Sequence, residues 1–176
     1  MEAFLKSVEK KAFRIIQIAT GGADDALDIL QESMMAFVRR YSTKDESEWR
    51  PLFYKVVQNK IRDWLRKEKL KRLFFFSIPA HQQDESEIMP DPIDTVPDLQ
   101  TANPLTGAKT SQALARLHIV IKQLPARQQQ VFLLRAWEGL STQETATAMN
   151  CTEGTVKTHY FRAVNRLKEE LEGTWP

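Results

Sequence analysis

The sequence predicts an all-α protein made of two small helical domains that are joined by a flexible acidic linker. Apolar residues recur three and four positions apart in both halves of the 176-residue chain, and no alternating run is long enough to indicate a sheet. Five of the eight prolines fall between residues 76 and 108, where the apolar residues follow no steady period. We therefore expect domains at residues 1–75 and 109–176, with the linker at 76–108.

Charge divides the chain within one residue of the same boundaries. Residues 1–76 carry 16 Lys and Arg against 11 Asp and Glu, residues 77–108 carry six acids and no base, and residues 109–176 carry nine bases against six acids. Basic blocks on either side of an acidic connector favour a polyanion as the partner of the blocks. From its length alone, the connector would span roughly 30 Å as a flexible coil and about 105 Å when fully extended.

Composition excludes several classes of protein. No apolar run approaches the roughly 20 residues that a membrane span requires, and the N-terminus lacks the pattern of an export signal, so we expect the protein in the cytoplasm. The single cysteine and the three scattered histidines do not form a zinc pattern. We expect no metal, no cofactor and no enzymatic activity.

The N-terminal block predicts three helices. The first ends at Gly21-Gly22, the second runs to about Tyr41, and the third follows a polar loop at residues 42–48 and extends toward Leu73. The apolar stripes that define them are Phe4, Val8, Ala12, Ile15 and Ala19; then Leu27, Leu30, Met34 and Val38; then Phe53, Val57, Ile61 and Trp64.

The third helix has a polar, cationic face opposite its apolar stripe. Residues 60–72 hold seven Lys and Arg against two acids, enough to neutralise several phosphates. Aromatic side chains beside such a strip provide stacking platforms for unpaired bases, and we assign Phe53 and Trp64 to the core but keep Trp49 and Tyr54 as candidates. The polar face comprises Lys55, Gln58, Asn59, Arg62, Arg66 and Lys69.

The acids of the second helix allow three interpretations. Asp24, Asp25, Asp28 and Glu32 could form a metal-binding cluster, or the first two could simply favour the helix dipole while the others lie in solvent. Like charges four positions apart are mildly unfavourable without a partner. A basic protein surface opposite this face is the interpretation that we favour.

The C-terminal block predicts helices near residues 109–122, 126–137, 142–149 and 153–171, and the last two have the spacing of a helix-turn-helix. Ser141 and Glu144 form a capping box, Asn150 suits a left-handed helix stop, and Thr152 caps the final helix. One face of the final helix is apolar, with Val156, Tyr160, Ala163, Leu167 and Leu171. The opposite face carries groups suited to a DNA major groove: Lys157, Thr158, Phe161, Arg162 and Asn165.

These motifs resemble those of the extracytoplasmic-function (ECF) sigma factors, the compact class of the sigma-70 family. Residues 28–32 (DILQE) resemble region 2.2, residues 49–67 resemble regions 2.3 and 2.4, and the segments Leu124-Pro125, Leu140-Ser141 and Gly154-Thr155-Val156-Lys157 resemble region 4. The resemblance implies a region 2 helical bundle and a region 4 helix-turn-helix bundle. It also implies initiation of transcription at specific promoters, without enzymatic chemistry.

The resemblance further implies the partners and the residues that meet them. Core RNA polymerase would be bound through the clamp helices of its largest subunit and the flap of its second-largest subunit, and an anti-sigma factor, often membrane-anchored in this family, would inhibit the protein. The polymerase-binding set is Asp28, Leu30, Gln31, Glu32 and Met35. The minus-35 DNA set is Lys157, Thr158, Phe161, Arg162 and Asn165. The minus-10 DNA set is Trp49, Tyr54, Lys55, Gln58, Asn59, Arg62 and Arg66.

Two rival functions remain open at this point. A stand-alone helix-turn-helix regulator would bind DNA autonomously and sense a ligand through the N-terminal block. A metal-dependent nuclease would use the acids between Asp24 and Glu32, although the sequence offers no second carboxylate cluster to complete such a site.

Overall fold

The computed structural model describes residues 1–76 and 115–171, which form helices joined by short turns, with no strand among them. The N-terminal block contains α1 (Glu2–Thr20), α2 (Ala23–Tyr41) and α3 (Glu46–Phe76). The C-terminal block contains a helical segment at residues 115–123, then α5 (Ala126–Phe132), the π-helical turn η1 (Leu133–Trp137), α6 (Thr142–Met149) and α7 (Glu153–Leu171). The predicted all-α class is confirmed. The predicted connector and the predicted helical residues 109–114 lie outside the described residues.

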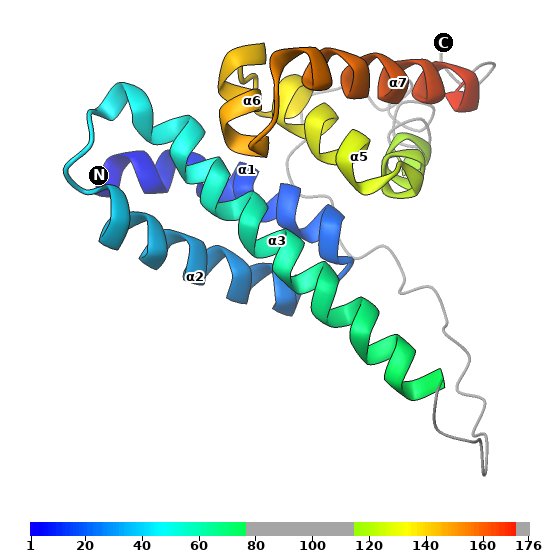
Figure 1. Ribbon diagram of the computed structural model, residues 1–176, viewed down its shortest axis with the longest axis horizontal. Helices are drawn as coiled ribbons and strands as arrows, with labels where there is room; N and C mark the ends of the chain where they lie inside the picture. Colours follow the sequence, from blue (N-terminus) through cyan, green and yellow to red (C-terminus); the bar gives the residue numbers. More distant parts are fainter. Residues whose placement is uncertain (77–114, 172–176) are drawn as a thin grey trace, which may run out of the picture.

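Helices α1, α2 and α3 form a bundle (Figure 1). A cluster of aromatic rings lies in its core. Phe37 and Phe53 are fully buried and meet edge to face with their centroids 5.6 Å apart, and Phe4 packs against both. Helix α1 ends at Gly21, whose φ of 86° is the left-handed conformation that glycine adopts without strain. The glycine stop expected from the sequence is therefore confirmed.

The apolar stripe predicted for α2 is confirmed at Leu30 and Met34, which lie in or against the core, but it is wrong at its two ends. Leu27 and Val38 are exposed, at 48% and 39%, while Phe37 is fully buried. The buried face also contains Ser33, whose hydroxyl donates to the carbonyl of Ile29 at 2.7 Å and is thereby satisfied inside the core. The buried face of α2 contains small and polar residues, so a pattern of large apolar side chains alone does not identify it.

Helix α3 begins earlier than expected, at Glu46, so the predicted loop at residues 42–48 is shorter. Pro51 therefore lies inside the helix, where it lacks the N–H that would bond to the carbonyl of Ser47. Ser47 is exposed, so water can hydrate that carbonyl. The buried stripe of α3 agrees with prediction at Phe53, Val57 and Ile61.

The two blocks pack against each other in this structure. Helix α3 makes its most extensive contact with α6, α1 contacts α5, and buried residues from both blocks form one continuous apolar core. Figure 1 shows α5, α6 and α7 lying together along one side of α1 and α3. Most of the helices predicted from the sequence are thus present. The packing of the N-terminal block against the C-terminal block was not predicted.

Candidate nucleic-acid interface

The helix-turn-helix is fixed at its corners by local capping bonds. Ser141 Oγ accepts the N–H of Glu144 at 3.1 Å, and the Glu144 carboxylate accepts the N–H of Ser141 at 2.7 Å, which completes the predicted capping box. Asn150 adopts the left-handed conformation, with φ 51° and ψ 55°. Thr152 Oγ1 accepts the N–H of Thr155 at 3.2 Å. The predicted capping box, the left-handed helix stop at Asn150 and the Thr152 cap are all confirmed.

Replacing Ser141 by alanine should lower the stability of the fold by about 1 kcal/mol, because the N–H of Glu144 loses its acceptor at the start of α6. Thermal unfolding followed by circular dichroism should show a midpoint lower by roughly 2–4 °C. Thr43→Ala, at an exposed threonine in the loop before α3, is the matched control. Equal midpoints for the two variants would show that the capping box contributes nothing measurable.

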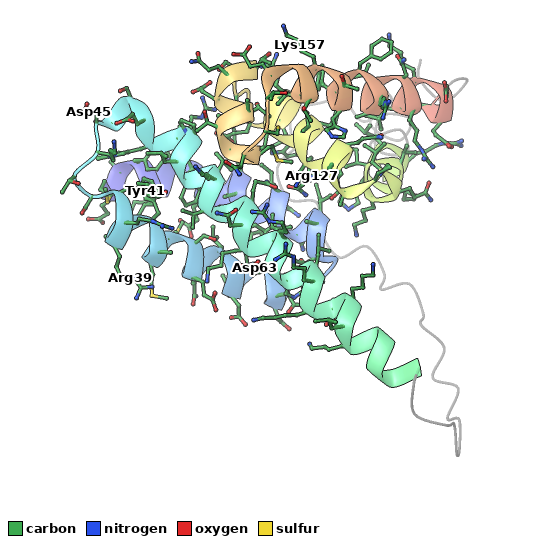
Figure 2. The ribbon with its side chains drawn as sticks, in the orientation of Figure 1. Arg39, Tyr41, Asp45, Asp63, Arg127 and Lys157 are labelled. Atoms are coloured by element: carbon green, nitrogen blue, oxygen red, sulfur yellow. The ribbon has the colours of Figure 1, made fainter. Side chains whose placement is uncertain are left out.

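Helix α7 presents its predicted DNA face to solvent. Phe161 is 66% exposed, and Lys157, Thr158 and Arg162 are exposed beside it, whereas Asn165 is half-buried. Figure 2 shows Lys157 projecting outward from α7, away from the rest of the molecule. Val156, Ala163 and Leu167 are buried on the opposite face, as predicted. The helix therefore has the segregation that a groove-reading helix needs.

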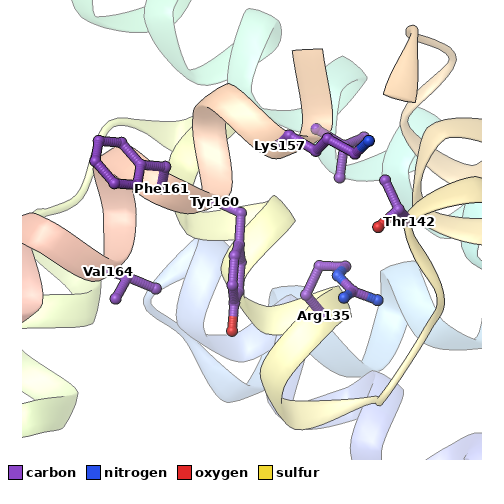
Figure 3. A pocket seen from close by; sticks show the side chains of 7 residues that line it. Arg135, Thr142, Lys157, Tyr160, Phe161 and Val164 are labelled. Carbon is purple, nitrogen blue, oxygen red and sulfur yellow. The ribbon is translucent and has the colours of Figure 1, made fainter. Parts of the chain in front are cut away.

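A pocket of about 280 Å³ adjoins this face (Figure 3). Arg135 and Thr142 lie on one side of it, and the Arg135 guanidinium sits over the Tyr160 ring at 5.7 Å from the centroid. Arg135 also donates to the carbonyl of Leu140, which orders the chain before α6. The sequence did not single out Arg135 or Thr142; Thr142 follows a recognisable cap, but only the tertiary fold brings Arg135 here. The pocket is lined by Arg135, Thr142, Val156, Lys157, Tyr160, Phe161 and Val164.

The polar face predicted on α3 is only partly accessible. Arg66 is exposed, and Lys55, Asn59 and Arg62 are half-buried, with Arg62 donating to the Asn59 side chain. Gln58 is 7% exposed, because its amide Nε2 donates to Oε1 of Gln130 in the C-terminal block at 2.9 Å. The minus-10 set therefore does not form one open surface in this arrangement.

The two aromatic candidates differ in their surroundings. Trp49 is half-buried; its ring packs on Phe4 and its Nε1 donates to the carbonyl of Lys44 at 2.8 Å. Tyr54 is fully buried, and its burial together with the nearby Glu138 carboxylate raises the pKa of its phenol well above the ordinary value. No base can stack on Tyr54 while the two blocks are packed as they are.

The polymerase-binding set needs one correction. Leu30 is 3% exposed and belongs to the core of the N-terminal block, so it cannot contact a partner. Asp28, Gln31, Glu32 and Met35 are exposed as expected. Leu27 and Val38, which the sequence had suggested as core residues, are exposed with them. An exposed row on the outside of α2, called here its outer stripe, comprises Leu27, Gln31, Met35 and Val38, spaced four, four and three residues apart. Three of these four residues are apolar.

The acids on α2 do not gather into a metal site. Within residues 1–76 and 115–171, no group of three or more His, Cys, Asp or Glu side chains could hold a metal ion. Glu32 instead accepts a hydrogen bond from Lys60 at 2.6 Å, and this bond, with the charge of Lys60, lowers the pKa of the Glu32 carboxyl. Among the described residues, none of the helices has an apolar stretch of the length that a membrane span requires.

Comparison with known proteins agrees with this geometry. The family model for sigma-70 region 4 matches residues 114–167, which include the helix-turn-helix. The RNA polymerase sigma-E factor of Streptomyces coelicolor is 33% identical over 148 residues, covering 84% of this chain and 72% of that protein. The ECF RNA polymerase sigma factor SigD of Mycobacterium tuberculosis is 31% identical over 105 residues, covering 56% of this chain and 50% of that protein.

A solved structure shares the fold. The sigma factor RpoE of Bartonella quintana, crystallised in complex with the anti-sigma factor NepR, aligns with a TM-score of 0.67 over 98% of this chain and 99% of that chain, at 20% sequence identity. The identity and coverage of the match to the Streptomyces protein show that the two proteins belong to the same family. The chain belongs to the RNA polymerase sigma factors, within their extracytoplasmic-function class.

Proposed function

We propose that this protein is a sigma factor that binds core RNA polymerase and directs it to specific promoters to initiate transcription. The observation that carries this proposal is the capped helix-turn-helix, whose second helix exposes Lys157, Phe161 and Arg162 within the segment matched by the region 4 family model. Residues 109–176 would read the minus-35 duplex with this helix. Residues 1–75 would bind the polymerase and the minus-10 element.

The minus-10 step would need binding energy rather than covalent chemistry. Flipping a base out of a duplex costs a few kcal/mol, which contacts to the unpaired base can offset. The cationic face of α3 supplies phosphate contacts through Arg62 and Arg66, and Trp49 lies at the start of the same helix. The protein would accordingly act as a binding factor and not as an enzyme.

The partners follow from the surfaces and from the family. The outer stripe of α2 would meet the clamp helices of the largest polymerase subunit, and the C-terminal block would meet the flap of the second-largest subunit. An anti-sigma factor would inhibit the protein, as the complex of the Bartonella relative suggests. These partners would place the protein in the cytoplasm.

Transcription in vitro with core enzyme and a pool of promoter templates tests the proposal. Addition of the purified chain should confer start sites that core enzyme alone does not use. The stand-alone regulator predicts a different result in a gel shift: tight, autonomous DNA binding that is unaffected by core enzyme. Failure to confer any start-site selectivity, together with such binding, would favour the regulator.

Replacing Gln31 and Glu32 together by alanine should weaken binding to core polymerase by about tenfold, because two exposed polar groups of the outer face of α2 are removed. Titration with labelled chain measures the affinity. The loss of the exposed Glu32–Lys60 pair should hardly change stability. Glu2→Ala with Glu9→Ala, two exposed acids on α1, is the control. An unchanged affinity for the α2 variant would remove this face from the polymerase interface.

A further inference from the structure

The pocket beside the outer face of α7 brings two cations together without an acid. Arg135 of η1 and Lys157 of α7 both line it, and its lining residues include no Asp or Glu. Among the described residues, neither cation makes an ion pair. Glu138 and Glu144, the acids nearest to Arg135 in the chain, are bonded elsewhere. Two positive charges that line one opening favour an anion as its ligand.

The polar groups of the pocket suit a phosphate of a DNA backbone. Figure 3 shows Arg135 and Thr142 on one side of the Tyr160 ring and Val164 on the other. Arginine, lysine and threonine side chains are all common donors to backbone phosphate oxygens. The pocket adjoins the face of α7 that carries Phe161, so a strand that borders a groove occupied by this helix passes close to it.

Arg135 is held in place by a ring and by a carbonyl group. Its guanidinium lies over the Tyr160 ring, 5.7 Å from the centroid, and it donates a hydrogen bond to the carbonyl of Leu140. The Tyr160 ring is itself supported, because it stacks on Phe132 with the ring centroids 6.2 Å apart and the planes inclined by 16°. Phe132 and Arg135 are three residues apart, so one short segment of the chain supplies both contacts to the ring.

These contacts order Arg135 and still leave it able to bind a phosphate. The attraction between a cation and a ring face does not use the N–H groups of the guanidinium. A guanidinium has five N–H groups, and the Leu140 carbonyl is their one acceptor among the described residues. An arginine that is already ordered pays a smaller entropic cost when it binds, which corresponds to about two- to tenfold in affinity.

From this geometry we propose that Tyr160 is a positioning residue for DNA binding. Its ring, supported by Phe132, holds the Arg135 guanidinium at the pocket, and Arg135 there binds a backbone phosphate of the minus-35 duplex. The phosphate contact sets the register of α7 in the groove without reading a base. The inference rests on the function proposed above for the identity of the DNA. The holding of Arg135 by Tyr160 is a property of the free chain.

Nitrogen-15 relaxation of the arginine side chains tests whether Tyr160 holds Arg135. The Nε–H signal of Arg135, identified by its absence in an Arg135→Lys chain, should be that of an ordered group in the full chain. Tyr160→Phe keeps the ring and should keep this order. Tyr160→Leu keeps an apolar side chain but removes the ring, so the signal should become that of a mobile group. Equal order in Tyr160→Leu and in the unaltered chain would overturn the positioning role.

Promoter binding by the polymerase complex tests whether Tyr160 acts through Arg135. The probe is a duplex with a start site selected in the transcription assay described above, and each variant is measured well below its melting temperature. Tyr160→Leu should lower the affinity about two- to tenfold when Arg135 is present and should have no further effect in an Arg135→Ala chain. Tyr160→Phe should bind normally. A loss of equal size in both backgrounds would contradict the proposal, because Tyr160 would then act independently of Arg135.

Salt dependence and neutral phosphates identify the ligand. Arg135→Ala should reduce the slope of log affinity against log salt concentration by about 0.9, the value for one phosphate contact. Lys168→Ala, at an exposed lysine near the end of α7, should leave the slope unchanged. One methylphosphonate, at a single position of the minus-35 element, should weaken binding of the unaltered chain but not of Arg135→Ala. If no position behaves in this way, Arg135 does not bind a DNA phosphate, which is the result that a site for free phosphate predicts.

Failure of this inference can be distinguished from failure of the proposed function. If start sites are selected but Arg135→Ala changes neither the affinity nor the slope, the sigma function stands and the phosphate site fails. If no template is selected, the sigma function fails. The relaxation data on the free chain then still decide whether Tyr160 holds Arg135, and the salt slope is measured with the free chain on a duplex of arbitrary sequence.

Discussion

Replacing Lys157 and Arg162 together by alanine should abolish promoter-specific transcription while leaving the binding of core polymerase intact. Both side chains are exposed on the face of α7 that we propose lies in the minus-35 groove. Each direct contact to a base or phosphate contributes about 1–3 kcal/mol, so the loss of two should lower promoter affinity by about 30-fold or more. Run-off transcription and a polymerase titration measure the two properties separately.

The matched control removes the same charge from the same helix. Arg166 and Lys168 are exposed farther along α7, and the N-terminal residues of a recognition helix are the ones that reach the bases. Arg166→Ala with Lys168→Ala should therefore retain most promoter activity. Equal losses in the two double variants would mean that α7 acts through general positive charge and not through a specific face. Loss of polymerase binding in the first variant would point to a damaged fold.

The helix-turn-helix was predictable because its determinants are local. Ser141 and Glu144 satisfy each other within one turn, and Asn150 and Thr152 set the angle to the next helix through their own backbone preferences. The outward face of α7 follows from its periodicity alone. None of these features requires knowledge of which other helix lies nearby, and the structure has all of them.

The features that escaped prediction depend on tertiary contacts. Helix α2 offers two neighbouring faces that both contain apolar residues, and the choice between them is made by α1 and α3, which accept Phe37 and leave Val38 outside. The burial of Gln58 depends on Gln130, 72 residues later in the chain. Helical periodicity predicts that a face is polar, but it does not indicate whether a second polar face will cover it.

Two leucine-to-alanine substitutions distinguish the buried face of α2 from its exposed face. Leu30→Ala should lower the free energy of unfolding by about 2–5 kcal/mol, because Leu30 is 3% exposed and its truncation leaves a cavity between α2 and its neighbours. For a chain of this size the melting temperature should fall by roughly 5–15 °C. Leu27→Ala, at a leucine that is 48% exposed, should change stability by less than about 1 kcal/mol.

The affinity for polymerase should change in the opposite way: it should fall in Leu27→Ala and stay the same in Leu30→Ala. It is measured well below the melting temperature of either variant, so that both chains are folded. Leu27 lies on the outer stripe of α2 with Gln31 and Met35, so its truncation should weaken the complex, whereas folded Leu30→Ala chains present an unchanged outer stripe. This crossed pattern cannot arise from a general loss of folded protein, which would reduce both properties in the same variant. If Leu27→Ala lowers the melting temperature and leaves the affinity for polymerase unchanged, Leu27 belongs to the core, as the sequence first predicted.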